Sequence, residues 1–165
     1  MITIIMNCLG LTRCIEFMRR RNKHILSDIE WKDSISYIPP VKEGFVIKVY
    51  DGDTITIATC VNNDKTIYRF SVRLNGIDCP EMKTHNESEK TLAVMAKNRV
   101  IELIYKKKVI LKDVKMEKYG RLLANVYYNN TCINQLLIKE RLALKYDGGK
   151  KTIPKDWMKF HNNTN

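Results

Sequence analysis

The stretch from Val49 to Glu81 constrains this chain more than any other, because it places acidic residues at the ends of short alternating runs. Asp51 and Asp53 flank a glycine at the break between two such runs, and Asp78 and Glu81 bracket a Cys-Pro pair just after a third. Carboxylates gathered at strand ends beside a rigid proline are poor material for a core, but they suit a hard cation that prefers oxygen ligands. The sequence therefore predicts a cation-binding edge on a small antiparallel sheet.

Alternating apolar and polar residues predict three strands around this edge. The alternation covers residues 45–50, 54–59 and 68–74, and a period of two is typical of strands with one buried face. Residues 62–64 predict a hairpin turn, because Asn and Asp tolerate the left-handed backbone that such turns need. The side chains expected to share the apolar face are Phe45, Ile47 and Val49 in the first strand, Ile55 and Ile57 in the second, and Tyr68, Phe70, Val72 and Leu74 in the third.

A long helix and a second pair of strands follow. Asn86 and Glu89 have the spacing of a capping box, and apolar residues then recur at helical spacing. Further strands are predicted at about 109–115 and 122–128, and a short helix at about 132–140. The helical stripe expected to face the core contains Leu92, Met95, Ala96, Val100 and Leu103.

The predicted order is typical of a five-stranded OB-type barrel, a mainly β fold with helices (α+β), whose long helix caps the end of the barrel. At 165 residues the chain is long enough for one domain with a real core and short for two. We expect this domain over residues 41–147, with an extension over 1–40 and a tail over 148–165. Trp157 and Phe160 are expected to pack the tail back onto the domain.

The charge of the chain favours a polyanionic partner. Its 29 Lys and Arg residues against 18 Asp and Glu residues give a net charge of +11, and binding to phosphate backbones is driven by the counterions that it releases. The charge alone does not separate nucleic acid from an acidic membrane surface. Together with the focused acidic edge, it matches what a metal-dependent phosphodiesterase needs.

The cysteines and the amino terminus bear on location. The five cysteines are odd in number and scattered, without the spacing of a zinc site or the density of a disulfide scaffold. They favour a reducing compartment, and we expect an intracellular, cytoplasmic protein. The apolar amino-terminal run is followed by its arginines, the reverse of the order in a secretory signal, and is shorter than the roughly 20 residues that span a bilayer. Weak membrane attachment through residues 1–12 is the alternative to a partly ordered tail.

Three motifs in series resemble the staphylococcal nuclease (thermonuclease) family. The sequence reads DGDT at 51–54, RLNGIDCPE at 73–81 and KYGR at 118–121, with the helical pattern between the second and the third. The resemblance covers roughly residues 44–146. It implies the same OB-type fold that the pattern of strands and helices predicts, and an enzyme that hydrolyses phosphodiester bonds.

The resemblance also implies a metal site and a base. In the family one Ca²⁺ is held by carboxylates at the positions of Asp53 and Asp78 and by the main-chain carbonyl at the position of Cys79. The best-known member has Thr at the last position, and a Cys is compatible with the role because the carbonyl supplies the contact. Glu81 matches the residue assigned as the general base that activates a water. Asp51 is expected to shape the turn.

The remaining implied residues bind substrate. Arg73 and Arg121 match arginines that grip the scissile phosphate, which suits a guanidinium fork that stays charged at any working pH. Lys118 and Tyr119 match positions that contact a terminal phosphate, and Tyr146 corresponds to a tyrosine that stacks on a base. One departure is Arg141, which stands where members often have Gly; a left-handed backbone there would cost about 1 kcal/mol.

Two hypotheses follow for the function. The first is a monomeric Ca²⁺-dependent endonuclease that cleaves DNA and RNA with little sequence preference and leaves 3′-phosphate ends, as the resemblance implies. The second is a non-catalytic OB-type module that binds nucleic acid or a protein. Such modules usually lose one or more of the acids and arginines, and this chain keeps all of them. His24, His85 and His161 have no ligand spacing, so no histidine-based mechanism is expected.

Overall fold

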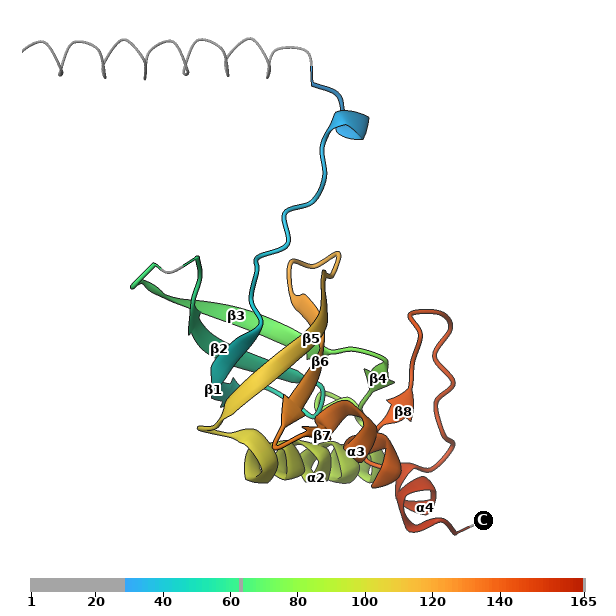
Figure 1. Ribbon diagram of the computed structural model, residues 1–165. Helices are drawn as coiled ribbons and strands as arrows, with labels where there is room; N and C mark the ends of the chain where they lie inside the picture. The colour runs from blue at the N-terminus through green and yellow to red at the C-terminus, as the bar shows by residue number, and fades with distance from the viewer. Residues whose placement is uncertain (1–28, 63, 165) are drawn as a thin grey trace, which may run out of the picture. The chain divides into compact units, whose positions relative to one another are not determined.

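The computed structural model describes residues 29–62 and 64–164, and Figure 1 shows its course. The chain divides after Tyr37 into two compact units. The described part of the first unit contains one short 3-10 helix, η1 (Trp31–Asp33). The membrane contact considered for residues 1–12 lies outside the described residues. Among the described residues, no helix combines the length and the apolar character needed to cross a membrane.

Five strands of the second unit close into a mixed barrel, which confirms the predicted fold class. They are β1 (Glu43–Val49), β2 (Thr54–Cys60), β3 (Ile67–Leu74), β5 (Lys108–Met116) and β6 (Leu122–Tyr128). The order β3-β2-β1-β5-β6 is antiparallel throughout, and a parallel pairing of β3 with β6 closes the ring. In this closing pair Val72 lies opposite Leu122, and Arg73 lies opposite Leu123. Strands that are distant in sequence are thereby joined beside the acidic edge.

The core inside the barrel follows the predicted alternation in β2 but not in β1. Ile55 and Ile57 are fully buried, as expected. In β1 Val49 is buried as predicted, but Phe45 and Ile47 are exposed and Val46 is buried instead, so the predicted face was wrong for the first part of the strand. The reason is an irregularity in the β1–β2 pairing between Val46 and Lys48, typical of a β-bulge, which shifts the register within the strand. Alternation on either side of a bulge no longer points to one face.

Helix α2 (Glu87–Ile104) runs across one end of the barrel (Figure 1). Its N-cap is Asn86, whose side chain accepts a hydrogen bond from the Glu89 backbone N–H at 3.2 Å. Leu92, Ala96 and Val100 are buried as predicted, but Met95 is exposed. Ala93 and Ile104 complete the buried face in its place. The helix therefore buries a stripe rotated slightly from the predicted one, and this stripe closes the barrel core.

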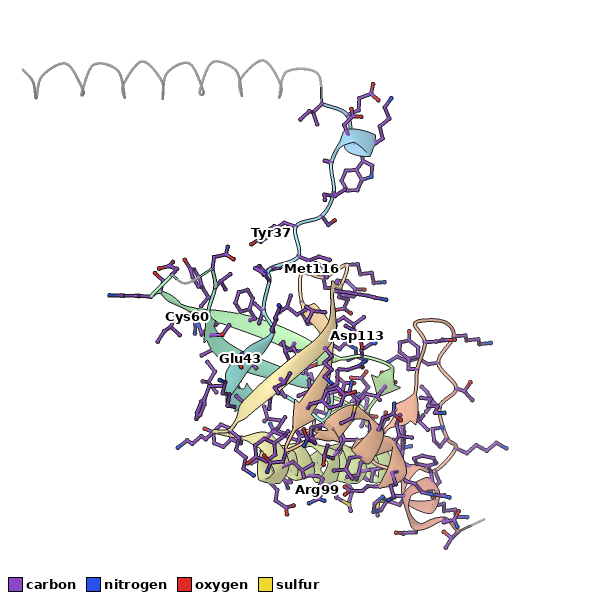
Figure 2. All side chains as sticks on the ribbon, viewed as in Figure 1. Tyr37, Glu43, Cys60, Arg99, Asp113 and Met116 are labelled. Atoms are coloured by element: carbon purple, nitrogen blue, oxygen red, sulfur yellow. The ribbon has the colours of Figure 1, made fainter. Side chains whose placement is uncertain are left out.

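Several short elements beside the barrel were not predicted. They are β4 (Ile77–Asp78), β7 (Thr131–Cys132), β8 (Leu144–Lys145) and α4 (Trp157–Asn162). Helix α3 (Ile133–Lys139) was predicted, as the short helix at about 132–140. Strands β4 and β8 form a two-stranded antiparallel sheet in which Asp78 lies opposite Leu144. Arg99, labelled in Figure 2, joins α2 to the end of α3, because its Nε and Nη2 contact the Glu140 carboxylate at 2.8 and 2.7 Å.

The chain beyond residue 146 is held at both ends. Trp157 is 2% exposed and belongs to the hydrophobic core, and Asp156 caps α4 and accepts a hydrogen bond from the Ser88 hydroxyl at 2.8 Å. Arg141 has a left-handed φ of 53°, the backbone conformation considered for this position from the sequence. Its guanidinium donates to the Phe160 carbonyl at 3.2 Å, a contact that glycine could not make. We call residues 147–156, between β8 and α4, the C-terminal strap.

Candidate active site

The turn between β1 and β2 brings Asp53 to the rim of the barrel. Gly52 lies so close to its neighbours that a Cβ there would stand 2.7 Å from the Cys79 Sγ and 2.8 Å from the Ala96 Cβ. Any larger residue would push the turn away from α2. Asp51 shapes the same turn, because its carboxylate accepts the Asp53 backbone N–H at 3.1 Å. Close packing and this local hydrogen bond therefore fix the position of Asp53.

Asp53 is an acid buried in a polar setting. It is 4% exposed, and its two oxygens accept hydrogen bonds from the Thr54 hydroxyl at 3.0 Å and the Cys79 backbone N–H at 3.1 Å. Burial raises its pKa from an ordinary 3.8 to about 6, although the nearby Arg73 and these hydrogen bonds act in the opposite direction. The free-energy cost of removing the charged carboxylate from water therefore exceeds the stabilisation that its neighbours provide.

Arg73 joins the two predicted metal-binding carboxylates. Its Nη1 lies 2.5 Å from the Asp53 Oδ1 and its Nη2 lies 3.0 Å from the Asp78 Oδ1. Asp78 is as buried as Asp53 and comes from β4, which β8 holds in place. The Arg73 guanidinium therefore holds together Asp53 and Asp78, which are 25 residues apart in sequence.

The donors around Asp53 and Asp78 fit a hard cation. Within residues 29–62 and 64–164, no group of three or more His, Cys, Asp and Glu side chains is arranged to hold a metal. Calcium does not need such a group, because carbonyl and water oxygens complete its shell. Asp53 and Asp78, two buried carboxylates held by one guanidinium, supply oxygen ligands. Added positive charge here would offset the free-energy cost of burying the charged form of Asp53. Burial also raises the pKa of the Cys79 thiol, which keeps the sulfur neutral and leaves the backbone as the polar part of that residue.

Glu81 projects from the loop after Pro80. Its side chain is 67% exposed, and its backbone N–H donates to the Glu89 Oε1 at 3.1 Å. The other oxygen of Glu89 accepts the Thr84 hydroxyl at 2.7 Å. The acid predicted to complete a capping box thus holds the loop of Glu81 against the first turn of α2. The sequence predicted only the capping role of Glu89, because no local sequence pattern indicates its contact with the backbone of Glu81.

Lys151 of the C-terminal strap is a member of the site that sequence reasoning missed. Its Nζ lies 2.9 Å from the Asp78 Oδ1 and 3.4 Å from the Glu81 Oε1. Burial alone would lower its pKa, but the hydrogen bond to Asp78 and the charges of Asp78 and Glu81 outweigh burial, so the pKa is raised. No motif marks this residue, which stands in a run of lysines that is typical of a solvated tail.

Arg121 lies directly before β6, on the side of the barrel where β6 meets β3. Its guanidinium makes two hydrogen bonds to Glu117, at 2.6 and 2.8 Å. These bonds raise the pKa of Arg121. The next residue, Leu122, pairs with Val72, so the backbone of Arg121 lies beside the strand that carries Arg73. Glu117 in turn has a lowered pKa, chiefly because of Arg121 and to a lesser extent because of Arg73. Glu117 and Arg121 flank the turn between β5 and β6, where the Glu117 backbone N–H donates to the Arg121 carbonyl at 2.8 Å.

A groove of about 990 Å³ leads away from Arg73. Its lining includes Leu123, Lys118 and Tyr146, and the Tyr146 hydroxyl donates to the Gly149 carbonyl at 3.1 Å. Tyr119 is not part of this lining. It is 71% exposed, and its ring lies 4.9 Å from the Lys118 Nζ. Of the three predicted substrate-binding residues, the structure thus brings Lys118 and Tyr146 into one groove with Arg73 and leaves Tyr119 on the open surface.

Comparisons with known proteins identify the family of this chain. The sequence pattern described as "Staphylococcal nuclease homologue" matches residues 71–161, more than half of the chain. The match includes Arg73, Asp78, Glu81 and Arg121, and it extends through the C-terminal strap. Asp53 lies before the matched segment and is tied to it by Arg73.

Curated relatives carry nuclease names. The chain is 37% identical over 103 residues to an "Uncharacterized endonuclease" of Haemophilus influenzae, covering 61% of the chain and 51% of the relative. It is 35% identical over 100 residues to the "Thermonuclease" of Staphylococcus hyicus, covering 59% and 56%. It is 30% identical over 112 residues to the "Micrococcal nuclease" of Shigella flexneri, covering 62% and 58%. The chain spans about half of the length of these relatives. From its sequence pattern and its barrel, the chain belongs to the staphylococcal nuclease family.

Proposed function

We propose that this protein is a Ca²⁺-dependent endonuclease that hydrolyses phosphodiester bonds of DNA and RNA with little sequence preference. The observation that best supports the proposal is the bridging of Asp53 and Asp78 by Arg73, with Arg121 directly before the strand that pairs with β3. Relatives with nuclease names lend further support. A site of this kind needs only a phosphate, a water and a cation to complete it.

The acids hold the cation in this proposal. Asp53 and Asp78 supply carboxylate oxygens, and Cys79 supplies its main-chain carbonyl. The chemistry that a bound calcium ion supplies is charge neutralisation at the phosphate. Buried carboxylates suit this role because they are already desolvated, so the ion meets little competition from water on that side.

Glu81 and the two arginines act on the substrate. The exposed carboxylate of Glu81 accepts a proton from the attacking water, whose oxygen forms a bond to phosphorus. The bond from phosphorus to the 5′ oxygen breaks, the leaving 5′ oxygen takes a proton from solvent water to become a hydroxyl, and the phosphate stays on the 3′ side. Arg73 and Arg121 hold phosphate oxygens as charge develops on them, which is worth about 3 kcal/mol or more for a well-placed donor.

The groove provides the path for the substrate strand. Lys118 contacts a phosphate, Tyr146 stacks on a base, and Tyr119 contacts the strand at the exposed rim. Stacking and backbone contacts do not read sequence, because every base has a π-face and every nucleotide carries the same phosphate. The net charge of +11 attracts the polyanion to the protein at a distance.

Digestion of labelled DNA and RNA by the purified protein tests the proposal. We expect hydrolysis in Ca²⁺, arrest by chelator and 3′-phosphate ends by mass spectrometry of the products. Glu81→Gln is expected to keep binding to the labelled strand and to lose turnover. Correctly folded protein that binds nucleic acid but cleaves none with any divalent ion would contradict the proposal, and products with 5′-phosphate ends would contradict the assigned bond cleavage.

A further inference from the structure

The C-terminal strap places a second cationic side chain, after Arg73, beside the acidic edge formed by Asp53, Asp78 and Glu81. Lys151 contacts Asp78 at 2.9 Å and Glu81 at 3.4 Å, and its Nζ lies 5.8 Å from the centre of the Tyr146 ring. The strap is fixed before Lys151 by the pairing of β8 with β4, and after it by the buried Trp157. The backbone is therefore anchored on both sides, so that the ammonium group is directed at the edge from a short, bounded segment.

Lys151 and a metal would share the Asp78 carboxylate. The Asp78 Oδ1 already accepts the Arg73 Nη2 at 3.0 Å and the Lys151 Nζ at 2.9 Å. A calcium ion takes its oxygen ligands at about 2.3–2.6 Å, so an ammonium on the same carboxylate would lie within several ångströms of the ion and repel it. The Lys151 side chain is 37% exposed and has room to turn toward water.

We propose that Lys151 is an internal counter-ion that neutralises Asp78 and Glu81 in the metal-free protein and competes with the divalent cation for Asp78. The inference rests on the proposed calcium site, and it adds a residue that sets the metal affinity of that site. Calcium binding has to displace the ammonium, so the apparent affinity is lower than the carboxylates alone would give. The strap thereby sets the calcium concentration at which the site fills.

Calorimetric titration of the full chain with CaCl₂, without nucleic acid, tests this competition. Lys151→Met is expected to tighten the calcium dissociation constant about tenfold, which corresponds to about 1.4 kcal/mol. In chelator, the same variant should melt at a lower temperature than the unchanged protein, because Asp78 loses a partner. Its rise in melting temperature on adding calcium should be larger.

Two variants serve as controls. Lys150→Met removes the same charge from the neighbouring position, for which no contact with Asp78 or Glu81 is found, and should change the dissociation constant less than twofold. Lys151→Arg keeps the charge and should stay near the unchanged protein. Equal tightening in Lys150→Met and Lys151→Met, or a Lys151→Met constant within twofold of the unchanged protein, overturns the inference alone. No calcium binding by any variant overturns the inference and the calcium part of the proposed function together.

Discussion

Asp53 should weaken the metal-free fold in a pH-dependent manner. Burial raises its pKa from 3.8 to about 6, so between these pH values the folded chain binds more protons at this site than the unfolded chain. Stability therefore falls as the pH rises through this window and stays reduced above it. At about 1.36 kcal/mol for each pKa unit, the full penalty is about 3 kcal/mol.

Asp53→Asn removes the charge and recovers most of this penalty. An amide has one acceptor oxygen, so the variant loses a hydrogen bond from Arg73 or a neighbour, at a cost of about 1 kcal/mol. We expect the variant to be about 1–2 kcal/mol more stable than the unchanged protein at pH 8 in chelator. At pH 4.5 the carboxylate is largely protonated in the folded chain, and the advantage should shrink by about 2 kcal/mol.

Urea unfolding in chelator, followed by circular dichroism at pH 8 and pH 4.5, measures this difference. Asp64→Asn is a control of opposite sign, because hydrogen bonds from the Thr66 backbone and the Tyr68 hydroxyl lower the pKa of this exposed carboxylate. That variant should be less stable by a similar amount at pH 8 and pH 4.5, because the stabilisation from a lowered pKa is lost only as the pH falls below the ordinary value of 3.8. The reasoning is refuted if Asp53→Asn is less stable than the unchanged protein at pH 8, or if its gain does not change with pH.

Two further predictions concern residues that position the proposed catalytic groups. Glu89→Ala should lower kcat about tenfold with little change in KM, because the loop of Glu81 loses its anchor; Glu89→Gln should restore part of the rate, and Glu87→Gln, in the same helical turn, should keep it. Glu117→Ala should lower kcat/KM about tenfold in steady-state assays, because the Arg121 guanidinium loses its two-point contact; an unchanged value would show that Arg121 is oriented without it.

Local sequence patterns could predict the barrel, but not its irregularities. The alternation in β2 gave the buried pair Ile55 and Ile57, because a strand without a bulge keeps one face throughout. The same reasoning failed in β1, where the irregularity between Val46 and Lys48 depends on how the strand pairs with its neighbour. Periodicity within one strand carries no information on that pairing.

The candidate site was predictable only where its residues lie in compact motifs. Asp53, Arg73 and Asp78 stand in two such motifs, and the structure brings them into direct contact. Lys151 contacts Glu81 from 70 residues away, and nothing in a lysine-rich tail indicates that contact. Arg121 stands in the compact KYGR motif, but its place beside β3 depends on the parallel pairing of β3 with β6, a long-range contact that no short pattern encodes.

A double-mutant cycle on Arg73 and Arg121 tests most directly whether both guanidinium groups act on one phosphate. The variants Arg73→Lys, Arg121→Lys and the combined change are compared in kcat/KM on a labelled single strand in Ca²⁺. Each single variant should lose about 100-fold or more in kcat/KM. The combined variant should have a kcat/KM no more than about tenfold below that of the less active single variant, because the effects of groups that serve one transition state are not additive. Losses that multiply in full, or an arginine whose replacement leaves the rate unchanged, would contradict the shared site.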